Sequence, residues 1–141
     1  MEKAQIQELI RAAFAARKFA YTPYSRFQVG AALLTKQGKV YTGCNIENAG
    51  YTPTNCAERT ALFKAVSEGE RAFSAIAVVG SMEGTVNTLV TGPCGVCRQA
   101  LYEFGGPALT VIMARTEEDY IVTTLGELLP YGFGPANLAG N

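Results

Sequence analysis

The apolar residues of this chain change their spacing repeatedly, from the period of a helix to that of a strand and back. Residues 2–18 and 56–68 carry apolar side chains three or four positions apart, as amphipathic helices do. Residues 27–35, 75–79 and 109–114 are apolar runs of strand length. Strands separated by helices need crossover connections, and those helices cover the sheet. The sequence therefore predicts a three-layer α/β domain.

The other segments complete this pattern. Lys36-Gln37-Gly38 separates residues 27–35 from a second β-rich run at 39–45, which predicts an antiparallel hairpin. The loop before the second helix ends in two good capping residues, Thr54 and Asn55, and one of them is expected as its N-cap. The remaining elements are expected as a helix over 97–104, an edge strand over 120–123, a short helix capped by Thr124 and running to Leu129, and a Gly- and Pro-rich tail from Pro130.

Length and charge limit the class of protein. A chain of 141 residues is long enough for one packed core and too short for two, so we expect a single domain over 1–141. Twelve basic residues balance twelve acidic ones and are scattered, which argues against a nucleic acid partner. The N-terminal segment is amphipathic rather than signal-like, and no apolar run approaches the roughly 20 residues of a membrane span. We expect a cytoplasmic protein without a membrane partner.

The cysteines and the absence of histidine point to a particular kind of metal site. Cys94 and Cys97 are three residues apart at the start of a helix, which presents both sulfurs on one side of its first turn. Cys56 begins another helix and offers a third sulfur. With no histidine in the chain, a transition-metal site must use Cys, Asp or Glu. Three sulfurs on Zn²⁺ leave the fourth tetrahedral position free, as in a catalytic site.

A structural zinc site is the alternative interpretation. Cys44 could be a fourth ligand, and a four-sulfur zinc would only hold the fold together. Against this, Cys44 lies near the end of an apolar strand, where a lone cysteine is usually a small buried hydrophobic residue. It also has no second cysteine at clip spacing. Cysteine counts alone leave both interpretations open.

Two charged residues follow Cys56 in the same helix. Glu58 is close enough to reach a water molecule at the metal and is the candidate catalytic residue, although a first-turn glutamate can also simply complement the helix dipole. Three thiolates on Zn²⁺ leave a formal charge of −1, which a nearby cation would offset. Arg59, on the helix face of Cys56, is the preferred candidate for that contact, and Arg98 is the second.

These motifs resemble one family closely. Cys56-Ala57-Glu58-Arg59, followed by Pro93-Cys94-Gly95-Val96-Cys97-Arg98-Gln99, resembles the zinc signature of the cytidine deaminase superfamily, and the all-cysteine form is similar to its small homotetrameric nucleoside deaminases. Further similarity lies in residues 24–31 and 43–49, so that the resemblance covers most of residues 20–104. It implies a three-layer α/β/α domain with a mixed five-stranded sheet, and one Zn²⁺ per subunit on Cys56, Cys94 and Cys97.

The resemblance also implies a substrate site. The matching family residues give Asn45 and Glu47 contacts to the ribose hydroxyl, Phe27 a packing contact with the nucleoside, and the Ala57 backbone a contact with the pyrimidine carbonyl. Phe133, in the C-terminal segment, would reach the site of a neighbouring subunit in a homotetramer. The implied reaction is hydrolysis of cytidine and 2'-deoxycytidine to uridine and 2'-deoxyuridine with release of ammonia, in pyrimidine salvage. The implied partner is a small nucleoside.

Without the resemblance, the same residues have plainer interpretations. Phe27 would be a strand core residue, and Asn45 and Glu47 the polar end of a hairpin strand. Two other functions stay open on the sequence: deamination of a related substrate such as blasticidin S or cytosine in a polynucleotide, and a non-catalytic binding module held together by zinc. Polynucleotide is disfavoured, because phosphate contacts need clustered basic residues.

Overall fold

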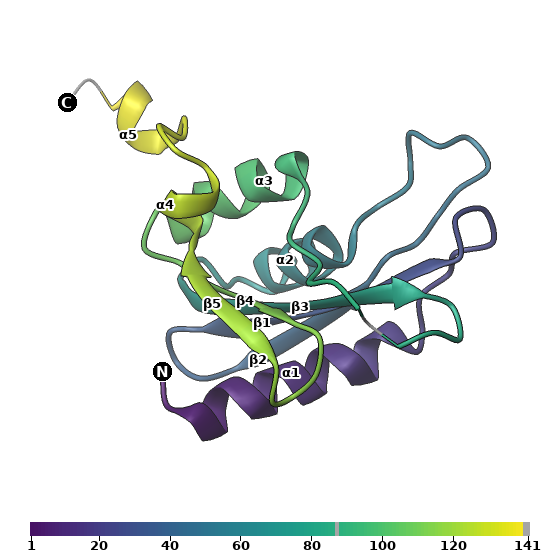
Figure 1. Ribbon diagram of the computed structural model, residues 1–141. Helices are drawn as coiled ribbons and strands as arrows, with labels where there is room; N and C mark the ends of the chain where they lie inside the picture. Colours follow the sequence, from purple (N-terminus) through teal and green to yellow (C-terminus); the bar gives the residue numbers. More distant parts are fainter. Residues whose placement is uncertain (87, 140–141) are drawn as a thin grey trace.

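The computed structural model describes residues 1–86 and 88–139 (Figure 1). The helices and strands confirm the predicted alternation. In chain order they are α1 (Lys3–Arg17), β1 (Phe27–Thr35), β2 (Val40–Cys44), α2 (Ala57–Ser67), β3 (Phe73–Met82), α3 (Gly95–Gly105), β4 (Thr110–Ala114), β5 (Tyr120–Thr124), α4 (Leu125–Leu128) and α5 (Pro135–Leu138).

The strands form one mixed sheet in the order β2-β1-β3-β4-β5. The hairpin of β1 and β2 is antiparallel, and β1 also pairs antiparallel with β3. Strands β3 and β4 are parallel, because α3 carries the chain back across the sheet between them. An antiparallel edge strand, β5, completes the sheet. The five-stranded mixed sheet is therefore confirmed.

Helices cover both faces of this sheet, as Figure 1 shows. Helix α1 packs below it through Ile6, Leu9, Ile10 and Ala13 against a face built mainly of small side chains. Helices α2 and α3 pack above it, through Ala57, Ala61, Leu62 and Leu101 among others. Each helix buries one apolar stripe and leaves its polar side in water, which is what stabilises the layers. The three-layer arrangement is confirmed.

The largest differences from the sequence prediction lie in β3, α3 and the C-terminal tail. Strand β3 is longer than the apolar run 75–79, because Gly80 to Met82 continue the pairing with β1. Helix α3 begins at Gly95 rather than Cys97, directly after its N-cap Cys94. The Gly- and Pro-rich tail, for which no element was predicted, contains a four-residue helix, α5, with Pro135 in its first turn.

The predicted N-cap of α2 is also wrong. The cap is Cys56, in an extended conformation, rather than Thr54 or Asn55. Asn55 is held outside the helix because its N–H and C=O exchange hydrogen bonds of 3.0 and 2.9 Å with Ile46. Its side-chain amide donates to Thr60 Oγ1 instead of capping the first turn. A tertiary backbone pairing has overridden a local capping preference.

Within residues 1–86 and 88–139, the longest helix is α1 with 15 residues, and none of the helices is both long and apolar enough to cross a membrane.

Candidate metal centre and active site

Three cysteine sulfurs come together where α2 and α3 begin. Cys56 is the N-cap of α2, Cys94 is the N-cap of α3, and Cys97 lies in the first turn of α3. Their Sγ atoms all lie within 4.8 Å of one another, and those of Cys56 and Cys94 are 3.7 Å apart. Neither sulfur accepts a capping hydrogen bond from the backbone N–H groups of its own helix, so both are available to a metal. Two helix N-termini favour negative charge at this point.

The sulfur spacing fits a tetrahedral zinc ion. Three sulfurs bound to Zn²⁺ at about 2.3 Å with tetrahedral angles lie about 3.8 Å from each other. The separation of Cys56 and Cys94 matches that value. Three thiolates are a donor set typical of zinc, and the described residues add no fourth His, Cys, Asp or Glu atom to the group. The arrangement can hold one zinc ion with one position left for a small ligand.

Cys44 lies outside this cluster. It pairs with Gly30 across the hairpin, and directly paired residues point to the same face of a sheet. The missing Cβ of Gly30 would meet α1, so this is the α1 face, opposite the helices that carry the three sulfurs. Burial raises the pKa of the Cys44 thiol, as expected for a small hydrophobic residue. The geometry favours the open three-sulfur site over the four-sulfur structural one.

Glu58 is a buried carboxylic acid in the first turn of α2. Only 4% of its surface is exposed, whereas a glutamate that merely complements a helix dipole lies in water. Burial, assisted by the negative charge at Cys56, raises the pKa of Glu58 to about 7. A group with that pKa can both take up and release a proton near neutral pH, as an acid–base catalyst must. The structure thus places a buried carboxyl, with a pKa near neutral, two residues from a sulfur of the cluster.

Arg59 contacts the sulfur cluster from the same helix. Its Nη2 atom lies 3.4 Å from the Sγ atom of Cys56. A hydrogen bond from Cys97, with the help of Arg59, holds the pKa of the Cys56 thiol well below its ordinary value. The same hydrogen bond, together with burial, raises the pKa of the Cys97 thiol.

Arg98 does not contact the sulfurs. Its Nε donates to the carbonyl of Pro93 at 2.7 Å, and its Nη1 donates to the carbonyl of Leu128 at 2.7 Å. These bonds fasten the peptide before Cys94 to the end of α4. Of the two arginines considered from the sequence, Arg59 is the one the structure places at the sulfurs.

The side chain of Asn45 is bonded to strand β1. Its Nδ2 donates to the carbonyl of Phe27, and its Oδ1 accepts from the N–H of Val29, both at 2.8 Å. The two bonds fix the amide orientation next to Phe27. Asn45 therefore joins the end of the hairpin to the start of β1.

Glu47 has a comparable arrangement two residues later. Its carboxylate accepts hydrogen bonds from the N–H groups of Tyr24 and Ser25 and from the Ser25 hydroxyl. These bonds, the Ser25 hydroxyl first, lower the pKa of Glu47. Glu47 also lines a pocket of about 310 Å³ beside Tyr24, Tyr51 and Thr54.

Between these two residues, Ile46 connects them to the metal cluster. Ile46 exchanges both main-chain hydrogen bonds with Asn55, and Asn55 directly precedes Cys56. On its other side, Tyr21 bonds to the backbone of Asn45 and Glu47. Backbone pairing thus fixes the two polar side chains relative to the first sulfur. The sequence contains no motif that predicts the backbone pairing of Ile46 with Asn55, because main-chain hydrogen bonds between separate segments do not depend on side-chain identity.

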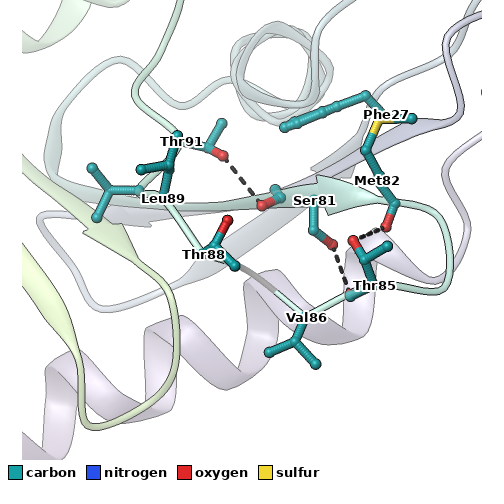
Figure 2. A pocket seen from close by; sticks show the side chains of 10 residues that line it. Phe27, Ser81, Met82, Thr85, Val86, Thr88, Leu89 and Thr91 are labelled. Atoms are coloured by element: carbon teal, nitrogen blue, oxygen red, sulfur yellow. Dashed lines mark hydrogen bonds between the residues drawn. The ribbon is translucent and has the colours of Figure 1, made fainter.

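Phe27 lies on the α2 side of the sheet and borders a cavity (Figure 2). The cavity has a volume of about 440 Å³, and Met82, Leu89 and Thr91 also line it. Neither the three sulfurs nor Glu58 is part of its lining. Thr91 Oγ1 donates to the carbonyl of Gly80 at 3.2 Å and closes the base of the loop that forms the outer wall.

Ala57 is buried, whereas Phe133 is exposed. Ala57 is fully buried between Cys56 and Glu58, against β2. Phe133 lies in the C-terminal segment with 56% of its surface exposed. Its carbonyl accepts a 2.8 Å hydrogen bond from Gln99 Nε2 of α3. This contact of Gln99 with the C-terminal segment was not predicted, since the sequence gives no signal for a side-chain hydrogen bond to a distant carbonyl.

Comparisons with known proteins agree with this geometry. Residues 3–114 match the family model described as the cytidine and deoxycytidylate deaminase zinc-binding region. The chain is 48% identical over 134 residues to a cytidine deaminase of Sporosarcina psychrophila, with 95% of each chain covered. It is 53% identical over 127 residues to a cytidine deaminase of Halalkalibacterium halodurans, with 90% of this chain and 92% of that protein covered.

A solved structure agrees as well. The crystal structure of cytidine deaminase from Burkholderia pseudomallei superimposes with a TM-score of 0.82 at 52% sequence identity, covering 89% of this chain and 97% of that one. The family match spans both helices that bear the sulfurs, and it is a match to a zinc-binding region. This chain belongs to the cytidine and deoxycytidylate deaminase family of zinc enzymes.

Proposed function

We propose that this chain hydrolyses cytidine and 2'-deoxycytidine to uridine and 2'-deoxyuridine, with release of ammonia. The observation that carries the proposal is the buried carboxyl of Glu58 beside three sulfurs that fit one zinc ion with a position to spare. Relatives about half identical to this chain over nearly their whole length are named cytidine deaminases. A non-catalytic zinc module would need neither the open position nor a buried acid.

Glu58 is the proton carrier of the proposed reaction. Bound at Cys56, Cys94 and Cys97, zinc would supply a Lewis acid that makes water a nucleophile near neutral pH. Glu58 takes a proton from the attacking water and delivers it to ring nitrogen 3 of cytosine while ring carbon 4 is attacked. The same carboxyl then carries the hydroxyl proton to the departing amino group. A pKa of about 7 suits both directions of transfer.

The substrate contacts are proposed from the same part of the fold. Asn45 and Glu47 bind the ribose hydroxyl, the aromatic ring of Phe27 packs on the nucleoside, and the backbone at Ala57 contacts the pyrimidine carbonyl. Support comes from the backbone pairing of Ile46 and Asn55, which keeps these side chains at a fixed offset from Cys56. We expect the substrate to be an uncharged nucleoside rather than a polynucleotide, since the chain has no cluster of basic residues to bind phosphates.

The wider setting is also part of the proposal. We infer one domain over 1–141 that acts as a homotetramer in the cytoplasm, in pyrimidine salvage. Each site would be completed at a subunit interface by Phe133 of a neighbour. The exposed ring of Phe133, whose backbone is anchored to α3 by Gln99, supports this assignment.

An assay of cytidine loss by absorbance, with bound zinc quantified in the same sample, tests the proposal. We expect turnover in proportion to zinc and one ammonia per cytidine consumed. Deoxycytidine, blasticidin S and a cytosine-containing oligonucleotide run in parallel distinguish the substrates. Zinc-loaded protein that releases no ammonia from any of them would contradict the proposal and favour a binding module. Sedimentation of the same sample checks the tetramer.

A further inference from the structure

Helix α2 lies unusually close to strand β2 at one residue, Gly43. A Cβ atom built on Gly43 would lie 2.5 Å from the carbonyl oxygen of Ala57 and 2.5 Å from the nitrogen of Ala61. Carbon atoms do not approach backbone atoms that closely, and both atoms belong to the helix backbone, which cannot rotate away as a side chain can. The helix therefore lies at a depth that only glycine permits.

This contact is at the chemically important end of the helix. Ala57, whose carbonyl faces Gly43, separates the metal ligand Cys56 from the proton carrier Glu58. A displacement of the first turn moves both residues with it. The other two sulfurs, on α3, are fastened elsewhere, because Arg98 bonds the peptide before Cys94 to Leu128. A shift of α2 would consequently change the distance between Cys56 and the α3 sulfurs.

The requirement for glycine at position 43 is one of space. The described glycines with positive φ are Gly38, Gly69, Gly84 and Gly106, so the backbone at Gly43 is one that alanine can adopt. Gly30, paired with the next residue along β2, has the mirror-image contact on the other face. A Cβ on Gly30 would lie 2.0 Å from the carbonyl oxygen of Ala13 in α1. The two glycines thus set the depths of helices on opposite faces.

We propose that Gly43 is a positioning residue: its missing side chain sets the depth of the first turn of α2 and so places Cys56 and Glu58 relative to Cys94 and Cys97. The part concerning Glu58 rests on the proposed function. The part concerning the sulfurs rests on their geometry alone. Gly30 supplies the matched control, because a methyl group there displaces a helix that carries none of these residues.

The test compares Gly43→Ala and Gly30→Ala with the wild type after loading with Co²⁺, whose thiolate charge-transfer and d–d bands report ligand geometry. Gly43→Ala is expected to shift these bands, to weaken metal binding and to lower kcat of the folded fraction roughly 10- to 100-fold with little change in KM. Gly30→Ala is expected to be less stable to denaturant but to keep the wild-type bands and kcat.

Wild-type bands and kcat in Gly43→Ala, or the same changes in both variants, would overturn the proposal. Should Gly43→Ala not fold, Ala61→Val adds volume on the same buried side of α2 and is expected to give the same shifts; wild-type values there would be equally decisive against it. If even the wild type releases no ammonia from cytidine, the proposed function fails, and the cobalt spectra still decide the role of Gly43.

Discussion

Arg59 lies one helical turn after Cys56 and points back at it, with Nη2 3.4 Å from Sγ. Three thiolates give zinc a net charge of −1, and this guanidinium is placed to offset it. We expect Arg59→Gln to weaken zinc binding about 10- to 100-fold and to lower activity, as changes next to metal ligands do. Competition with a chromophoric chelator measures the affinity. Arg71→Gln is the control, since Arg71 donates to the carbonyls of Val66 and Glu70, at the opposite end of α2 from the sulfurs.

Glu58→Gln should separate metal binding from catalysis. The amide keeps the shape of the side chain but cannot carry the proton, so kcat should fall by at least about 100-fold while zinc content stays at one per chain. Glu68→Gln, an exposed change at the other end of α2, should have no effect on either quantity. Full activity in a zinc-loaded Glu58→Gln protein would exclude Glu58 as the proton carrier.

Glu58 should also make the metal-free protein less stable as pH rises. Its pKa is about 7 in the folded protein against an ordinary 4.5, so unfolding releases a proton between these values. The stabilisation is complete below pH 4.5 and is lost as pH rises through 7, a change of about 3 kcal/mol. Urea denaturation at pH 5 to 8 should show the stability of the wild type falling relative to that of Glu58→Gln, because the lowered pKa of the Cys56 thiol acts in the opposite direction in both proteins. Parallel curves for the two proteins would contradict the assignment.

Cysteine substitutions should distinguish the three ligands from the fourth cysteine. Changing Cys56, Cys94 or Cys97 to alanine should release zinc and abolish activity together, because two sulfurs hold the ion poorly. Cys44→Ala should keep both, since its side chain lies on the opposite face of the sheet. Treatment of the wild type with a strong chelator should reproduce the ligand variants. Zinc loss from Cys44→Ala would restore the four-sulfur structural interpretation.

Asn45→Ala should reduce both stability and substrate affinity. It removes two hydrogen bonds to β1 and leaves the Val29 N–H without its partner, which costs about 1–3 kcal/mol of unfolding free energy. Loss of the proposed ribose contact should raise KM more than it lowers kcat. Asn48→Ala, which removes an exposed turn bond to Gly50, is the control. A change in stability with an unaltered KM would leave Asn45 a purely structural role.

The sequence predicted the layers and the sulfur cluster because both depend on local patterns. Apolar spacing identified α1 and β1 to within a residue, and the clip at Cys94 and Cys97 is set by helix geometry alone. The joining of Cys56 to that clip could not follow from spacing, since 37 residues and strand β3 lie between Cys56 and Cys94. Cys56 was proposed as the third ligand because it begins another helix in a chain without histidine, and the family resemblance implied the same residue.

The wrong N-cap of α2 and the position of Arg98, the second candidate for the sulfur contact, share one physical cause. Asn55 is a better capping residue than Cys56, yet its backbone pairing with Ile46 excludes it from the helix. Arg98 has the right spacing to face the sulfurs, yet two carbonyls outside its own helix bind it. In each case main-chain atoms distant in sequence compete for a group whose local preference is different. Capping preferences and helical spacing describe a residue and its sequence neighbours, so they cannot predict such tertiary hydrogen bonds.

The hydrogen bond from Thr91 Oγ1 to the carbonyl of Gly80 joins the two ends of the segment between them, and residues of that segment line the cavity beside Phe27. After Thr91, only Gly92 and Pro93 separate this hydrogen bond from Cys94 at the start of α3. Insertions, deletions or grafted peptides between residues 83 and 90, after the end of β3, would therefore leave the position of Cys94 unchanged. Protein engineering could therefore rebuild the wall of the Phe27 cavity while the three sulfurs keep their arrangement.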